Sequence, residues 1–208
     1  RPLKPESQLA LWICLGTLCR IGELLQAEWK NVDLKNGVWF IPVANVKGSR
    51  RKKQDHHVFL SVFTTHYFSK LRQLTGHSQW CFPAKHHDGH VDLKVVSKQV
   101  GDRQSRFKNR KPLARRRHDD TLVLSGGLNG EWTPHDLRRT GATMMQALGV
   151  SLDVIDRCQN HVLAGSRVRR HYLHHDYAAE KKEAWNLLSN KLIDILIGQN
   201  GLERLKKQ

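Results

Sequence analysis

The sequence predicts a mainly α-helical protein with one small antiparallel β-sheet. Apolar residues recur at helical spacing over long segments, most clearly in residues 8–26 and 178–197. Two short runs of β-branched and aromatic residues, 38–42 and 57–60, flank a basic segment and predict a β-hairpin. With 208 residues, the chain is long enough to bury one good core.

The composition indicates a polyanionic partner. The chain has 35 Lys and Arg against 19 Asp and Glu, a formal charge of +16, and nucleic acid is the first candidate for such an excess. A membrane is disfavoured, because the sequence has no signal peptide and no apolar run of about eighteen residues. We therefore expect a cytoplasmic protein whose 4 cysteines are reduced thiols.

The first segments are expected to form a linker and a broken helix. Two prolines make residues 1–5 a linker, and because the chain does not begin with Met we expect its N-terminal portion to have been removed. Ser7 is placed to cap a helix over residues 8–26. Gly16 and Gly22 predict a break within it, giving two helices at an angle.

Arg20 lies near this break, among apolar neighbours. Such an arginine must reach a partner or water, and two interpretations stay open. It forms an ion pair with Glu23 or Glu28, or its bidentate fork is directed at an anionic ligand.

The segment between the two predicted strands is strongly basic. Five of its cations follow one another closely: Lys47, Arg50, Arg51, Lys52 and Lys53. A charge run is most often a solvated face, but a cationic hairpin tip can also contact a DNA groove or backbone.

A helix is expected over residues 62–75, and a short buried strand over residues 80–83. The histidines that follow this strand, near Cys81, are His86, His87 and His90. Their spacing matches no standard structural zinc site, so we expect no metal here.

A second basic segment, residues 103–117, follows a predicted helix over 93–103. It contains eight Lys or Arg and no acid, which predicts a mobile loop that orders on a polyanion. Its proposed DNA-contacting side chains are Arg106, Lys108, Arg110, Lys111, Arg115, Arg116 and Arg117.

The stretch that begins at Trp132 predicts an anion-binding helix start. Thr133 is a predicted N-cap, with a proline at the first helical position and Asp136 three residues after the cap. His135 and Arg138 then share one face of the first turn, where a helix N-terminus favours phosphate. The next residue, Arg139, is a further candidate DNA contact, and the helix is expected to end at Gly149.

The C-terminal part is predicted to be helical. Ser151 caps a helix that ends near residue 160, and His161 follows it. A short helix or turn over 166–174 carries Tyr172. The last helix, 178–197, packs either on its own core or on a neighbouring molecule, and residues 198–208 form a basic tail.

Six of these residues resemble, in order and approximate spacing, the catalytic set of tyrosine recombinases, the phage-type integrases. They are Arg20, Lys47, His135, Arg138, His161 and Tyr172. Arg-Ile-Gly-Glu-Leu is similar to the first arginine box of this family, and His-Asp-Leu-Arg-Arg-Thr matches its second box. The resemblance covers residues 5–197 and is nearest to integrases of genomic islands and satellite phages.

The resemblance implies the fold and the chemistry. The fold would be the tyrosine-recombinase catalytic domain, spanning residues 6–197. Tyr172 would attack a DNA phosphodiester and form a 3′-phosphotyrosine link, while Arg20 and Arg138 clamp the non-bridging oxygens. His135 would accept or return the tyrosine proton, and His161 would hydrogen-bond the phosphate. Lys47 would protonate the leaving 5′-oxygen, and no metal, ATP or other cofactor would be needed.

The resemblance also implies partners. These are double-stranded DNA, further copies of the chain in a tetramer on DNA, and accessory DNA-bending proteins in a bacterial nucleoid. The N-terminal DNA-binding domain usual in the family is missing from this sequence, so we expect the isolated chain to bind DNA weakly.

Several alternatives stay open. Lys52 or Lys53 could replace Lys47 as the general acid, and Tyr177 is a rival nucleophile. A DNA-binding module without chemistry and a type IB topoisomerase need similar residues. A metal-dependent nuclease is a more distant alternative.

Overall fold

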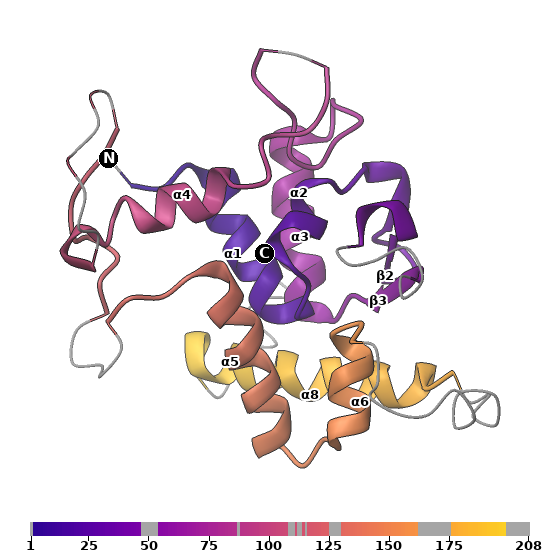
Figure 1. Cartoon of the computed structure of the whole chain (residues 1–208). Coiled ribbons are helices and arrows are strands. Elements are labelled where there is room, and N and C mark those ends of the chain that lie inside the picture. Colours follow the sequence, from indigo (N-terminus) through magenta and orange to yellow (C-terminus); the bar gives the residue numbers. More distant parts are fainter. Residues whose placement is uncertain are drawn as a thin grey trace.

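The computed structural model describes residues 2–46, 54–86, 88–107, 111, 114, 116–124, 130–161 and 176–198. Within these ranges the architecture is mainly helical with one small sheet, as predicted. The elements are assigned below in chain order, and Figure 1 shows their arrangement.

Helix α1 (Pro5–Thr17) begins earlier than expected, because Pro5 occupies the first helical position and Lys4 is the N-cap. The prediction that Ser7 caps this helix is therefore wrong, since Ser7 lies buried inside the first turn. Leu3 is buried as well, so the chain already packs on the domain before the helix begins.

The predicted break is present near Arg20, in the sequence between Gly16 and Gly22. Helix α1 ends at Leu18, which adopts a left-handed conformation with φ 59°, and α2 (Ile21–Leu25) follows after Arg20 as N-cap. Gly16 and Gly22 do not mark the break: Gly16 lies inside α1 in close contact with α3, and Gly22 lies inside α2.

The hairpin is confirmed and extended by one strand. Strands β1 (Val32–Asp33), β2 (Val38–Ile41) and β3 (His56–Phe59) form an antiparallel sheet in the order β1-β2-β3, with Ile41 opposite His56. Strand β1 is too short for an alternating pattern to reveal it.

The strand predicted over residues 80–83 is not a regular strand. Its residues form isolated antiparallel bridges instead, Glu28 with Trp80 and Pro83 with His90. The prediction of burial was correct for Cys81 and Phe82, which lie in the core.

The remaining helices agree closely with the predicted segments. They are α3 (Val62–Thr75), α4 (Val95–Gly101), α5 (Pro134–Ala147), α6 (Leu152–Cys158) and α8 (Ala178–Ile197), with single 3-10 turns at Trp29–Asn31, Val43–Asn45 and Ser105–Phe107. The expected capping box is present at the start of α5, where Thr133 and Asp136 bond each other's backbone.

The core is built around α1, which lies at the centre of the helices in Figure 1 and packs against α3, α5 and α8. Helix α8 runs behind α5 and α6 in Figure 1 and docks on its own chain. Its Trp185 is 1% exposed, and the indole Nε1 donates to the Thr17 carbonyl at 3.2 Å. No helix in the described part of the chain has the length and hydropathy to cross a membrane.

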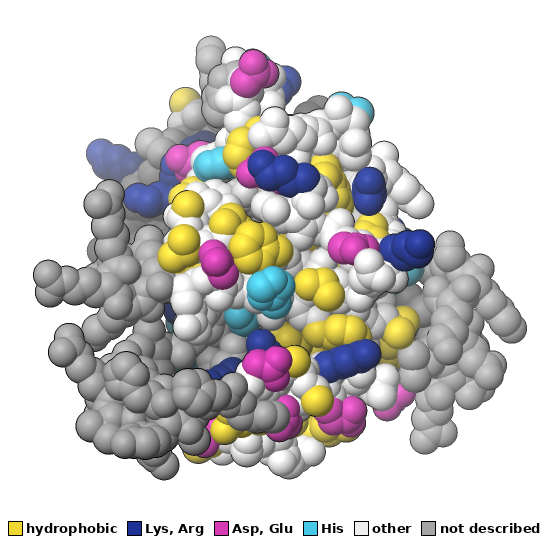
Figure 2. Space-filling view, turned by 90° about the vertical axis from the view of Figure 1, so that its right-hand side faces the viewer, with side chains coloured by type: hydrophobic (Ala, Val, Ile, Leu, Met, Phe, Trp, Pro, Cys, Tyr) yellow, Lys and Arg dark blue, Asp and Glu magenta, His cyan; other side chains and the backbone are white. Residues whose placement is uncertain are grey.

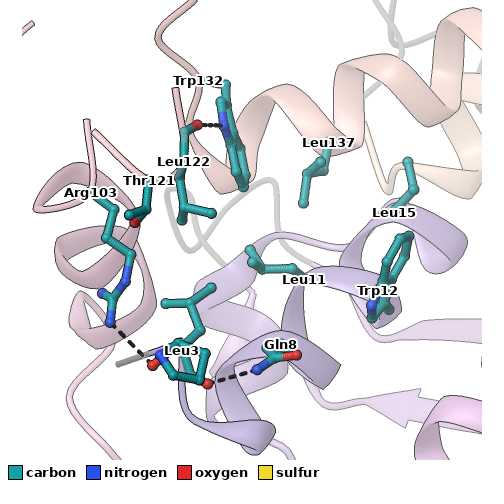
Figure 3. Close-up of a pocket in the computed structure, with 11 residues that line it drawn as sticks. Leu3, Gln8, Leu11, Trp12, Leu15, Arg103, Thr121, Leu122, Trp132 and Leu137 are labelled. Carbon is teal, nitrogen blue, oxygen red and sulfur yellow. Dashed lines mark hydrogen bonds between the residues drawn. The ribbon is translucent and has the colours of Figure 1, made fainter. Parts of the chain in front are cut away.

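An apolar cavity of about 490 Å³ lies where the first residues meet α1 and α5 (Figure 3). Trp12 and Leu137 contribute to its walls, and Trp132 is fixed at its edge by donating to the Leu122 carbonyl at 2.8 Å. None of the predicted site residues lines this cavity.

Gly141 lets α5 approach α1 closely, because a Cβ built at this position would meet the Leu15 carbonyl oxygen at 2.8 Å. We predict that Gly141→Ala lowers the free energy of unfolding by about 1–3 kcal/mol, although alanine is the better helix former. Urea denaturation measures the effect.

Gly22→Ala is the matched control. A Cβ at Gly22 meets nothing within 4 Å, so this variant should be as stable as the wild type or more stable by about 0.5–1 kcal/mol. A Gly141→Ala protein of at least wild-type stability would show that the close approach is not required.

Candidate active site around Arg138

Arg138 joins the ends of two other helices. Its guanidinium is 2% exposed; Nη1 donates to the Leu18 carbonyl at 2.5 Å and Nη2 donates to the Gln159 carbonyl. The Gln159 side-chain amide in turn donates to the Arg138 carbonyl at 3.4 Å. Leu18 is the C-cap of α1 and Gln159 the C-cap of α6, so a single side chain satisfies one orphan carbonyl at each helix end.

This contact gathers three of the predicted site residues. Arg20 follows Leu18 by two positions, His161 follows Gln159 by two positions, and His135 lies one turn before Arg138 on α5. Burial, and next the nearby charge of Arg20, lower the pKa of Arg138 to about 10. The two guanidinium groups are therefore close enough to repel each other.

Arg20 forms the ion pair that the sequence offered as one alternative. Its Nη1 lies 2.8 Å from Glu23 Oε1, and its backbone N–H donates to Glu23 Oε2 at 3.0 Å. The other suggested partner, Glu28, pairs with Lys30 instead. The Arg20 side chain remains 25% exposed, so the ion pair leaves surface for contact with an anion.

His135 lies in the first turn of α5 and is exposed. Desolvation, followed by the charges of Arg138, Arg139 and Arg20, lowers its pKa, and only Asp136 opposes them. The imidazole is consequently neutral near pH 7, the state in which it can accept a proton.

His161 is positioned by the way α6 ends. Asn160 takes the left-handed conformation at φ 49°, the His161 N–H donates to the Asp156 carbonyl at 2.8 Å, and the Asn160 N–H donates to the Arg157 carbonyl at 3.1 Å. These are the bonds of a Schellman motif. The His161 ring is held by its Nδ1, 2.9 Å from Asp156 Oδ1.

Strand β3 is fastened to the same helix end. The His56 Nε2–H donates to the Cys158 carbonyl at 3.1 Å, and the Gln54 side-chain amide donates to Asn160 Oδ1 at 3.4 Å. The root of the basic hairpin therefore lies beside the segment that carries His161.

His56 is 6% exposed and stays neutral. Burial first, and then the charge of Lys181, lower its pKa to about 3, with further contributions from Arg138 and His57. The Cys158 carbonyl can only accept a hydrogen bond, and His56 contacts it through Nε2. The neutral ring must therefore carry its proton on Nε2. Its role as a link between sheet and helix cannot be read from the sequence, where it is one of 13 histidines.

The described cations of the second basic segment are largely paired. Arg116 donates to both carboxylate oxygens of Asp102 at 2.6 and 2.8 Å, Arg117 pairs with Asp119, and Arg106 lies 3.9 Å from Asp120. The sequence analysis predicted a basic loop here and did not predict these ion pairs with the flanking acids. Lys111 is exposed, and Arg139 lies 3.3 Å from Asp136.

Figure 2 shows the molecule from the right-hand side of Figure 1, with positive and negative side chains interspersed among apolar ones. The formal excess of positive charge is thus not gathered into one continuous patch of described side chains on this face.

Nine predicted site residues lie outside the described residues, and the structure does not test their placement. They are Lys47, Arg50, Arg51, Lys52, Lys53, Lys108, Arg110, Arg115 and Tyr172.

Metal ligands do not gather in the part of the chain that the structure describes, where no group of three or more His, Cys, Asp or Glu has suitable geometry. Burial raises the pKa of the Cys81 thiol, which disfavours the thiolate that a metal would require. His90 bonds the Val91 carbonyl through Nδ1 at 2.7 Å.

The ends of α1 and α6 thus meet at a buried arginine of α5, beside a three-stranded antiparallel sheet, in the fold of tyrosine-recombinase catalytic domains. The model of the phage integrase family matches residues 1–179, and the chain belongs to this family.

The chain is 28% identical over 174 residues to the prophage integrase IntA of Escherichia coli (strain K12), a match that covers 84% of this chain and 35% of that protein. It thus spans about a third of the length of this relative.

Solved structures support the fold. The integrase from mycobacterium phage Brujita aligns over 90% of this chain and 53% of its own, with a TM-score of 0.60 and 14% identity. The Tn1549 transposon integrase, solved in complex with transposon right end DNA, aligns over 88% of this chain and 59% of its own, with a TM-score of 0.54 and 16% identity.

The low pKa of His56 predicts a pH-dependent stability. Between pH 6.5 and 3, His56 is protonated in the unfolded chain but not in the folded chain. The free energy of unfolding therefore falls as the pH falls. Between pH 7 and 5 we expect His56 to account for a loss of about 2 kcal/mol. Urea denaturation at the two pH values should show that His56→Gln removes this contribution.

The control is His57→Gln, at the exposed neighbouring position. It should keep the wild-type dependence on pH. If His56→Gln also keeps it, His56 does not stay neutral in the folded protein.

Proposed function

We propose that this chain is the catalytic domain of a site-specific DNA integrase, which cuts and rejoins DNA through a 3′-phosphotyrosine intermediate. The observation that supports the proposal is the Arg138 contact, in which the helix that carries His135 is joined to the helix ends that precede Arg20 and His161. Membership of the phage integrase family and the likeness to a transposon integrase solved with DNA support the same conclusion.

Charge explains why a phosphodiester suits this site. Arg20 and Arg138 repel each other, and the N-terminus of α5 adds its partial positive charge beside His135. A phosphate between the guanidinium groups would relieve the repulsion. The charge that builds on its non-bridging oxygens during attack would be stabilised further, at about 10²–10³ in rate for each donor of this type.

The proton transfers follow from the same arrangement. Tyr172 would attack phosphorus, and its phenol has an ordinary pKa of about 10, so it needs a base. His135, neutral near pH 7, would take this proton and later return it. The departing 5′-oxygen would receive a proton from Lys47, which follows the buried Val46 at the root of the hairpin.

The remaining roles are assigned on the same basis. His161, oriented by Asp156, would hydrogen-bond the phosphate. The basic segments and Arg139 would contact the DNA backbone, giving binding that weakens steeply with salt. The proposal also includes assembly as a tetramer on DNA, accessory DNA-bending proteins and a place in the bacterial nucleoid. The chemistry would need no metal.

A covalent trapping experiment tests the function. A duplex nicked close to the cleaved phosphate loses a short oligonucleotide after attack, so the protein stays joined to the DNA. We predict that the wild type accumulates this adduct in EDTA and that Tyr172→Phe abolishes it while DNA affinity stays within about twofold. Peptide mapping of the adduct should identify Tyr172.

The alternatives give other results. A wild-type chain that binds the duplex well and never forms the adduct would be a DNA-binding module. Relaxation of supercoiled DNA without recombinant products would indicate a topoisomerase, and cleavage that EDTA stops would indicate a metal-dependent nuclease.

A further inference from the structure

The segment that carries Tyr172 is bracketed by two contacts with one helix. The segment begins after His161, which follows the end of α6 and whose Nδ1 lies 2.9 Å from Asp156 Oδ1. The described chain resumes at Asp176, and Tyr177 follows as the N-cap of α8. The Arg157 guanidinium carbon lies 3.8 Å from the centroid of the Tyr177 ring. Asp156 and Arg157 are consecutive residues of α6. The two described residues that flank the segment, His161 and Tyr177, therefore contact the same turn of this helix.

The contact between Arg157 and Tyr177 is close. The other cation–π pairs among the described residues have separations of 5.0 to 6.0 Å. The Arg157 Nε is buried and has no hydrogen-bond partner in the described part of the protein. At 3.8 Å the guanidinium lies over the ring, which is a favourable arrangement for an arginine and an aromatic side chain.

The backbone of Tyr177 is unusual at this point. Its φ of 54° and ψ of 23° place it in the left-handed region, which is unfavourable for a bulky side chain. Such a conformation persists only where the surroundings hold it, and such residues cluster at functional sites. The chain turns here into α8, because the Lys181 N–H donates to the Tyr177 carbonyl at 2.9 Å.

We infer that Arg157 and Tyr177 form a positioning pair for the nucleophile. The pair fixes the point at which the chain enters α8, five residues after Tyr172 in the sequence. This inference rests on the proposed function. Tyr177 itself is then a positioning residue and not the nucleophile.

Tethering explains why such a pair matters for rate. An attacking oxygen must come within about 3–3.5 Å of phosphorus, and a misplacement of about 1 Å can cost about 10²-fold in rate. A segment held at both ends samples fewer positions than one held at a single end. Loss of the pair should therefore slow cleavage without weakening DNA binding.

The test is the single-turnover rate of adduct formation on the nicked duplex at saturating protein, measured together with DNA affinity and urea stability. Arg157→Gln and Tyr177→Leu should each slow the reaction about tenfold or more, with DNA affinity within about twofold of wild type. The double variant should be no slower than the slower single variant, because both remove one contact. Arg157→Lys, which keeps a cation, should recover part of the rate.

Two controls separate the pair from its surroundings. Lys182→Gln removes another cation–π contact of α8, the one in which Nζ lies 5.0 Å from the Phe59 ring, and should leave the rate unchanged. Tyr177→Phe keeps the ring and should react at close to the wild-type rate.

Each contrary result has a distinct meaning. Wild-type rates in Arg157→Gln and Tyr177→Leu, fully additive losses in the double variant, or losses matched by an equal fraction of unfolded protein overturn the positioning role. Abolition of the adduct by Tyr177→Phe also overturns it, because Tyr177 would then be the nucleophile. A wild type that forms no adduct overturns the proposed function itself, and this inference with it.

Discussion

The buried guanidinium of Arg138 is the interaction on which the rest of the site depends. Burying a charge is costly unless hydrogen bonds and counter-charges compensate. Here the carbonyls of Leu18 and Gln159 accept from both terminal nitrogens, and the charge of Glu23 favours the protonated form. The compensation is incomplete, because burial and Arg20 still lower the pKa to about 10. The fold thus holds two neighbouring positive charges in a state that an anion would stabilise.

The site is assembled from helix ends, which have unpaired backbone groups. The C-terminal carbonyls of α1 and α6 are satisfied by Arg138, and a further α6 carbonyl by His56 of the sheet. Left-handed residues at Leu18 and Asn160 end these helices and turn the chain toward Arg20 and His161. The close approach of α5 to α1 at Gly141 brings Arg138 within reach of Leu18. The turns that end α1 and α6 and the packing of α5 on α1 therefore together determine the position of the Arg138 contact.

Much of the fold could be predicted from the sequence, since the longer helices show clear periodicity and α5 begins with a capping box. The break after α1 lies between Gly16 and Gly22, near Arg20, as predicted. The residue that ends α1 is nevertheless Leu18, in a left-handed conformation that leucine seldom adopts. His135 and Arg138 were found because they share one helical turn. The contributions of His56 and Gln159 could not be predicted, because each contact joins a side chain to a backbone carbonyl distant in sequence. The contact of Asp156 with His161 depends on the turn that ends α6. The ion pairs of Arg106, Arg116 and Arg117 were not predicted, because a run of cations does not show which of them fold back onto the flanking acids.

The most direct test of this account is amide hydrogen exchange in Arg138→Lys, since a lysine ends in a single nitrogen, whereas Arg138 reaches the two carbonyls with two separate ones. If Arg138 joins the ends of α1 and α6, the amides of Leu18, Asn160 and His161, which are hydrogen-bonded in these turns, should all exchange faster than in the wild type. The amides of α3, which Arg138 does not contact, should keep their protection. Faster exchange at only one of the two helix ends, or at neither, would contradict the account.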